Sequence, residues 1–136
     1  MDDVLLNKSA IIERYLYRIK DEYIGHEDDF ERNFARQDAI ILNLLRACEA
    51  AIDMGIRILK IKKLGIPQSS RDIFVLLETS KIIDIPLSES LQAMVGFRNI
   101  AIHDYRKMDL QIVRHIVETK LSDLLTFAEI GIKKAL

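Results

Sequence analysis

The stretch from Phe30 to Leu59 reads FERNFARQDAIILNLLRACEAAIDMGIRIL and contains no proline. Its apolar residues recur in steps of three, four and seven, a spacing that places them on one face of an α-helix. They are Phe30, Phe34, Ile41, Leu44, Leu45, Cys48, Ile52, Ile56 and Leu59. At 1.5 Å per residue, this helix is about 45 to 50 Å long. Because that length exceeds the diameter of a compact domain of this size, we expect the helix either to bend or to offer part of its length to a partner.

Residues typical of helix ends flank this stretch. Asp28 or Asp29 can cap the start of the long helix, and Gly65 and Pro67 end it. A first helix is expected before it; Asp2 or Asp3 can cap its start, and Gly25 suits its end. The apolar stripe of that first helix is Leu5, Ile12, Leu16, Ile19 and Tyr23.

Three further helices are expected after the long one. Residues 69–72 (SSRD) resemble a capping box that opens a short helix, residues 84–86 (DIP) open another, and Asp109 can cap the last. Their apolar residues are Phe74, Leu76 and Leu77, then Leu87, Leu91, Met94 and Val95, then Leu110, Val113, Val117, Leu121, Leu124 and Phe127. The sequence therefore predicts an all-α fold, an antiparallel bundle of about five helices that forms one domain over residues 1–136.

The composition supports a globular helical domain and excludes several classes of protein. Of the 136 residues, 49% are hydrophobic and 30% charged, a mixture that excludes disordered and fibrous chains. The single cysteine, Cys48, excludes an internal disulfide, and the first residues do not resemble a signal peptide. No apolar run approaches a membrane span, so we expect a cytoplasmic protein without a membrane partner. The net charge of −1 is not that of a general nucleic-acid binder, so any contact with RNA needs a local basic patch.

Most familiar catalytic motifs are missing from the sequence. The three histidines, His26, His103 and His115, are not spaced as paired ligands on one helix, and with one cysteine a zinc site is not expected. There is no glycine-rich phosphate loop and no Gly-x-Ser-x-Gly turn. His26 is expected to be a solvated loop residue, and His115 a residue at the edge of the last helix. We therefore expect neither a metal nor a cofactor.

The remaining candidate is the segment GFRNIAIHDYRK, residues 96–107. On a regular helix Arg98 and Tyr105 share a face, whereas Arg98 and His103 point about 140° apart. Arg98 and His103 can meet only if the helix breaks near Ile102, or if a second copy of the chain completes the site. The spacing favours a cleft between two protomers.

The chemistry of this segment fits cleavage of RNA without a metal. A histidine can take or give a proton at neutral pH, and an arginine can hold phosphate oxygens with two hydrogen bonds. The 2′-hydroxyl of the substrate itself can then attack the phosphorus. The competing interpretation is that Arg98, Asp104, Arg106 and Lys107 form only a solvated helix end.

The string Arg98-Asn99-x-x-x-His103-x-Tyr105 resembles the HepT-type toxin branch of the HEPN superfamily, whose signature is R-x(4–6)-H. Residues 37–44 (QDAIILNL), followed by Cys48-Glu49-Ala50, resemble the central helix of that family. Residues 65–72 (GIPQSSRD) resemble the connection that follows the central helix. The resemblance covers nearly the whole chain, and the ordered series of matches is far more specific than the short signature alone.

The resemblance implies a toxin that acts as a metal-independent endoribonuclease and forms a homodimer. Arg98 and His103 of both protomers would then be catalytic in one cleft, with a 2′,3′-cyclic phosphate as the expected product. It also implies a partner, a minimal nucleotidyltransferase antitoxin that transfers AMP from ATP to Tyr105. The alternative function is a HEPN-type dimeric module that binds a nucleotide or a partner without cleaving.

Other residues are assigned supporting roles in this hypothesis. Asn99 and Asp104 are expected to support the catalytic pair. Glu49 is a candidate for orienting Arg98, or else a helix carboxylate without a catalytic role. From Arg98 to Arg114 the chain carries four basic and two acidic side chains, a local excess of two positive charges. The residues of this stretch that are expected to contact RNA are Arg106, Lys107 and Arg114.

Overall fold

The computed structural model describes residues 2–134 of the chain. Over that range it contains six α-helices, one 3-10 helix and no strand. The helices are α1 (Asp3–Tyr23), α2 (Phe34–Lys62), α3 (Ser70–Thr79), α4 (Ile85–His103), α5 (Leu110–Thr119) and α6 (Leu121–Lys134), and the 3-10 helix η1 (Tyr105–Lys107) follows α4. The predicted all-α bundle is confirmed. None of the described helices is long and apolar enough to cross a membrane.

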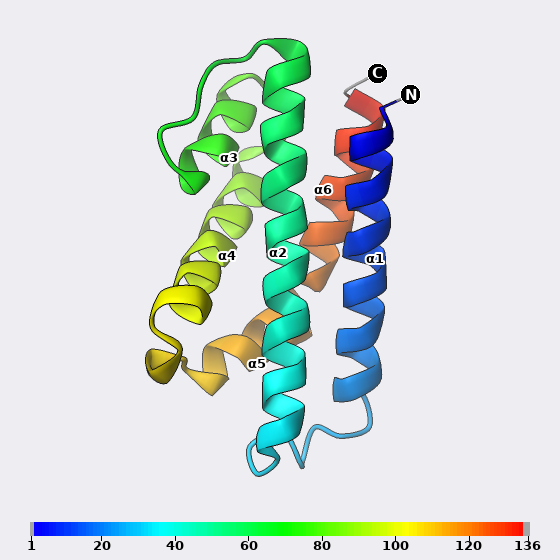
Figure 1. Ribbon diagram of the computed structural model, residues 1–136, viewed down its shortest axis with the longest axis vertical. Helices are drawn as coiled ribbons and strands as arrows, with labels where there is room; N and C mark the ends of the chain where they lie inside the picture. Colours follow the sequence, from blue (N-terminus) through cyan, green and yellow to red (C-terminus); the bar gives the residue numbers. More distant parts are fainter. Residues whose placement is uncertain (1, 135–136) are drawn as a thin grey trace.

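Helix α2 is the centre of the bundle. It contacts α1 and α6 on one side and α3 and α4 on the other, and α5 crosses the bundle near its lower end (Figure 1). Its fully buried side chains include Ile40, Leu44, Met54 and Ile58. Burying one such side chain contributes roughly 1.5–3 kcal/mol to folding. The long helix therefore stabilises the domain along most of its length.

A close approach between α2 and α3 depends on Gly55. A Cβ atom added there would lie 2.5 Å from Cγ2 of Ile73, which is itself buried. That distance is shorter than non-bonded carbon atoms tolerate. Gly55 therefore lets α3 pack directly on the backbone of α2.

The start of α2 differs from the expected one. Asn33, not Asp28 or Asp29, is the N-cap, and its side chain accepts a hydrogen bond of 3.0 Å from the amide of Arg36. Phe30 lies in the preceding turns, fully buried, while Phe34 is 77% exposed. The side chain of Gln37 donates a 2.8 Å hydrogen bond to the Phe30 carbonyl, which holds this turn against the helix.

The predicted last helix is two helices, α5 and α6, which meet at Lys120. Lys120 has φ −120° and ψ −5°, and the hydroxyl of Thr119 donates a 2.7 Å hydrogen bond to the carbonyl of His115. Such bonds from a threonine to its own helix favour a bend. The apolar stripe continues through the bend in steps of four from Val113 to Val117 to Leu121, so the pattern of the sequence does not reveal it.

The other expected helix starts are confirmed. Asp2 caps α1, Ser69 caps α3, Asp84 caps α4 and Asp109 caps α5, each accepting a hydrogen bond from a backbone amide. Pro86 lies in the first turn of α4, where a proline removes no hydrogen bond. These caps fix where α4 begins and hence the position of its far end, which carries the candidate site.

Candidate functional site

The candidate segment lies at the end of α4 and in η1. Helix α4 is regular as far as His103, and the amide of Asp104 still donates to the carbonyl of Ile100 at 2.9 Å. The helix therefore does not break near Ile102, which was one of the two ways for Arg98 and His103 to meet, and the chain turns only at Asp104. Because the helix is regular between them, Arg98 and His103 point about 140° apart. No hydrogen bond joins the two side chains within residues 2–134.

The side chain of Arg98 is partly buried and oriented by two neighbours. Its Nη1 donates a 2.9 Å hydrogen bond to Oδ1 of Asn99, and its Nη2 lies 4.0 Å from Oε2 of Glu49 on α2. Only 22% of the side chain is exposed, and the buried Nε has no hydrogen-bond partner in the described part of the chain. The structure thus brings Arg98, Asn99 and Glu49 together, while His103 is exposed on another face of α4.

Cys48 lies beside Glu49 on the buried side of α2. Burial is the main reason that its pKa is raised to about 12, and the charge of Glu49 adds to the shift while Arg98 opposes it. The thiol is therefore protonated at neutral pH and is not a nucleophile.

Tyr105, at the start of η1, is held by a residue that the sequence analysis gave no role. Its hydroxyl donates a 2.6 Å hydrogen bond to Oδ1 of Asp38 on α2. Burial and this bond raise the pKa of Tyr105 to about 12, although 45% of the residue is exposed. Asp38 lies within residues 37–44 (QDAIILNL), one of the strings that carry the family resemblance, and that resemblance was the available sign in the sequence that Asp38 has a function.

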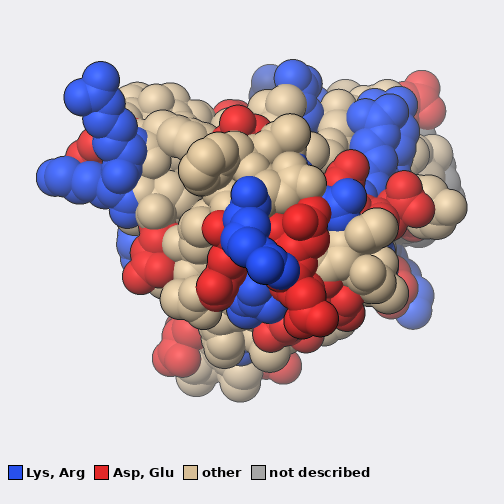
Figure 2. Space-filling model, turned by 90° about the horizontal axis from the view of Figure 1, so that it is seen from below, with Lys and Arg blue, Asp and Glu red and all other residues tan. Residues whose placement is uncertain are grey.

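The charged residues around the end of α4 do not all meet. Asp104 pairs with Lys107 at 3.2 Å, on the surface, instead of with the catalytic candidates. Arg106 is exposed and has no ion pair among the described residues. Figure 2, which views the molecule from below Figure 1, shows acidic side chains gathered around basic ones in the middle of that end, with further basic side chains projecting at its edges. This end is of mixed charge, as the net charge of −1 suggests.

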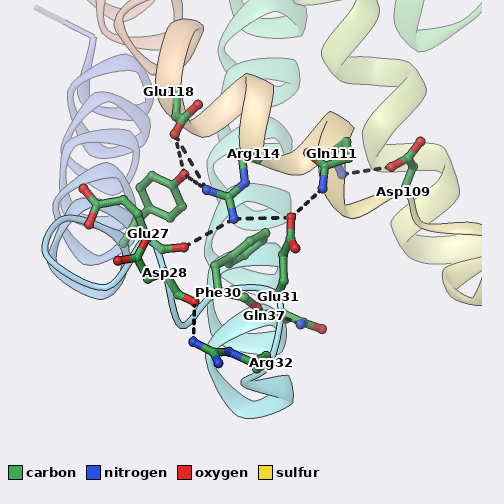
Figure 3. Close-up of polar contacts among 11 residues, drawn as sticks. Glu27, Asp28, Phe30, Glu31, Arg32, Gln37, Asp109, Gln111, Arg114 and Glu118 are labelled. Carbon is green, nitrogen blue, oxygen red and sulfur yellow. Dashed lines mark hydrogen bonds and ion pairs between the residues drawn. The ribbon is translucent and has the colours of Figure 1, made fainter.

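Arg114 of α5 has a structural role that differs from the expected RNA contact (Figure 3). It donates to the Tyr23 hydroxyl at 2.8 Å and to the Glu27 carbonyl at 3.3 Å. It also pairs with Glu31 at 3.7 Å and with Glu118 at 4.0 Å. Its guanidinium is therefore engaged in joining α5 to the end of α1 and to the loop before α2.

The remaining histidines lie outside the candidate site. His26 is exposed in the loop between α1 and α2, as expected. His115 is exposed on α5, and its Nε2 lies 3.4 Å from the Thr119 hydroxyl. Only His103 accompanies the Arg98 segment.

Comparison with known proteins identifies relatives of nearly full length. A protein named mRNA nuclease HepT from Shewanella oneidensis is 47% identical over 130 residues, which cover 96% of this chain and 97% of that protein. One similar solved structure is the tri-AMPylated Shewanella oneidensis HEPN toxin in complex with an MNT antitoxin, with a TM-score of 0.92 and 47% identity. The alignment covers 98% of this chain and 99% of that one.

A second solved structure is described as a toxin–antitoxin with AMP-PNP. It has a TM-score of 0.92 and 46% identity, and the match covers 98% of this chain and 99% of that one. The family model described as Ribonuclease HepT-like matches residues 12–130. The resemblance inferred from the sequence is thereby confirmed, and the chain belongs to the HepT-like ribonuclease family of HEPN proteins.

Proposed function

We propose that this protein is a toxin that cleaves RNA as a metal-independent endoribonuclease, with Arg98 and His103 as its catalytic residues. The observation that carries the proposal is the state of Arg98, which is oriented by Asn99 and Glu49 and keeps a buried Nε without a hydrogen-bond partner. A guanidinium held in this way is prepared for a phosphate oxygen. The printed name of the Shewanella oneidensis relative, an mRNA nuclease, supports RNA as the substrate.

The cleavage is a transesterification within the RNA. The 2′-oxygen attacks the adjacent phosphorus, the bond from phosphorus to the 5′-oxygen breaks, and a 2′,3′-cyclic phosphate and a 5′-hydroxyl form. The imidazole of one His103 accepts the proton of the 2′-hydroxyl and, once protonated, gives a proton to the leaving oxygen. Arg98 stabilises the charge that develops on the phosphate oxygens.

Two protomers would form the complete site. Arg98 and His103 point apart on one regular helix, so a two-fold axis near the end of α4 would place His103 of one chain opposite Arg98 of its partner. Ile100 and Ile102, between these residues, are 37% and 44% exposed. Their apolar surface fits burial in a homodimer interface.

Regulation would follow from attaching AMP to Tyr105. In that reaction the phenolic oxygen attacks the α-phosphorus of ATP, the bond to pyrophosphate breaks, and the phenol proton leaves, with Asp38 in place to accept it. A minimal nucleotidyltransferase antitoxin is the proposed partner. The similar Shewanella oneidensis structure supports it, because that structure is described as a tri-AMPylated HEPN toxin in complex with an MNT antitoxin. The added phosphate would compete for the positive charges of Arg98 and Arg106, and the adenosine would fill the cleft.

Digestion of total RNA in excess EDTA tests the proposed activity. The unmodified protein should produce fragments that end in 2′,3′-cyclic phosphate, identified by mass spectrometry, while Arg98→Ala and His103→Ala produce none. Circular dichroism checks that both variants fold. If the unmodified protein binds RNA or nucleotide but leaves RNA intact, the non-catalytic binding module is the correct function.

A further inference from the structure

Three arginines from two helices gather around one tyrosine ring, away from the end of α4. The guanidinium carbons of Arg14 and Arg18 on α1 each lie 5.3 Å from the centre of the Tyr15 ring, and that of Arg46 on α2 lies 5.9 Å from it. All three arginines are exposed, and Tyr15 is partly buried. A cation over an aromatic ring is attracted to its electron density, so the ring orders three otherwise flexible side chains.

These three guanidiniums lack counter-charges. Within residues 2–134, none of them lies within 4.0 Å of a carboxylate, whereas two nearby carboxylates already have partners. Asp53 pairs with Lys8 at 3.0 Å and Glu49 lies 4.0 Å from Arg98. Three like charges that converge without a counter-ion repel one another, and a bound anion would relieve that repulsion.

The ionisation of Tyr15 reports the same positive field. Burial raises the pKa of its hydroxyl, but the opposing influence of Arg46 and Arg14, through charge and hydrogen bonding, is larger in sum, and the pKa is lowered. Positive charge therefore dominates at the hydroxyl as well as over the ring.

A pocket lies beside this cluster and extends to Glu49, a neighbour of Arg98. It has a volume of about 410 Å³ and is lined by Arg14 and Tyr15 from α1 and by Arg46 and Glu49 from α2. Glu49 is also the carboxylate beside Arg98. Glu49 thus lines the same pocket as Arg14 and Arg46 and also neighbours Arg98, so an RNA strand held by the cluster would run near the proposed catalytic arginine.

We propose that Arg14, Arg18 and Arg46 form a phosphate-binding subsite that holds the RNA strand beyond the bond that is cut. The inference rests on the proposed ribonuclease function, because it assigns the site a part of the same substrate. Arginine suits this role since its planar donors hold phosphate oxygens in pairs, and the Tyr15 ring keeps those donors oriented before the RNA arrives. A chain with a net charge of −1 needs such a local concentration of positive charge to hold a polyanion.

The test compares two triple variants that remove the same charge. Arg14→Gln/Arg18→Gln/Arg46→Gln removes the cluster, and Lys60→Gln/Lys62→Gln/Lys63→Gln removes three exposed lysines at the end of α2 as a matched control. Binding of a 2′-O-methyl RNA, which cannot be cleaved because its 2′-oxygens are blocked, is followed by fluorescence anisotropy over a range of salt concentrations. Arg14→Lys/Arg18→Lys/Arg46→Lys keeps the charge and serves if the glutamine variant does not fold.

We expect the glutamine variant of the cluster to bind RNA about tenfold more weakly or worse. The slope of log affinity against log salt concentration should be shallower by about 2, because three phosphate contacts with a single strand are lost. The control should bind as the unmodified protein does, and the lysine variant should keep the salt slope but lose affinity. Equal affinity and slope for cluster and control variants would overturn the subsite. Loss of antitoxin binding with RNA binding intact would also overturn it and assign the surface to a protein. Failure of the unmodified protein to cleave RNA would instead overturn the proposed function.

Discussion

The hydroxyl of Tyr105 lies 2.6 Å from Oδ1 of Asp38, a hydrogen bond that joins η1 to the first part of α2 across 67 positions of the chain. The contact places a carboxylate directly at the oxygen that we propose as the site of AMP transfer. It also holds the turn after α4 against the long helix. The position of Tyr105 therefore depends on α2 as much as on its own segment.

Asp38→Asn should lower the pKa of Tyr105 from about 12, but only in part, because burial, the largest cause of the raised pKa, remains while the negative charge is removed and the bond that favours the protonated phenol is weakened. NMR titration of ring-labelled tyrosine measures this shift, and Asp21→Asn on α1 is the control. In the presence of the antitoxin and ATP, Asp38→Asn should slow the addition of AMP by about 10²-fold or more, as loss of a general base does. An unchanged rate would mean that Asp38 takes no proton in that step.

Tyr23→Phe should destabilise the fold by about 1–3 kcal/mol in urea denaturation, because it removes one hydrogen bond from each of two charged groups. The Tyr23 hydroxyl donates to Glu118 at 2.5 Å and accepts from Arg114 at 2.8 Å. Tyr17→Phe, at an exposed ring, is the matched control. A loss no larger than that of the control would show that the network adds nothing to stability.

Stability should fall at alkaline pH for the same reason. Burial, then the bond to Glu118, raises the pKa of Tyr23 to about 12 from an ordinary value near 10. Since the folded protein holds this proton more tightly than the unfolded chain, the stabilisation is complete below about pH 10 and is lost as the pH rises towards 12. Urea midpoints measured between pH 9 and 12 should decline less in Tyr23→Phe than in the unmodified protein. Urea midpoints that fall equally in both proteins would contradict the link between the proton of Tyr23 and the stability of the fold.

Arg114→Ala and Arg106→Ala should separate structure from substrate binding. Arg114→Ala should cost about 2–3 kcal/mol of stability, since it removes hydrogen bonds, ion pairs and contacts with the rings of Tyr23 and Phe30. Arg106→Ala should leave stability within about 0.5 kcal/mol, because its side chain is exposed. In RNA binding the order should reverse. Arg106→Ala should weaken the affinity for RNA more than Arg114→Ala does, and its affinity should depend less steeply on salt concentration. The opposite pattern would restore Arg114 as an RNA contact.

The sequence predicted the class of fold and most helix starts, because caps and apolar stripes are local signals. Asp84 and Ser69 cap as expected, whereas Asn33 replaces the predicted caps of α2, since the preceding turns bury Phe30. The bend at Lys120 interrupts no apolar pattern and could not be seen.

The candidate site was predictable only as a set of residues. The motif identified Arg98, His103 and Tyr105, but the partners of these side chains come from distant positions. Asp38 meets Tyr105 from α2, and the cluster on Tyr15 combines α1 with α2. Contacts of this kind depend on how the helices pack, which no spacing within one helix reveals.

The most direct test of a site shared by two protomers is complementation between inactive variants. Arg98→Ala and His103→Ala are mixed, allowed to exchange subunits, and assayed for RNA cleavage. A mixed dimer carries one intact Arg98 and one intact His103 on different chains, and half of the dimers are mixed, so activity should return to about a quarter of the unmodified level. A mixture that exchanges subunits, as mass spectrometry would show, yet stays as inactive as either variant alone would contradict the shared site.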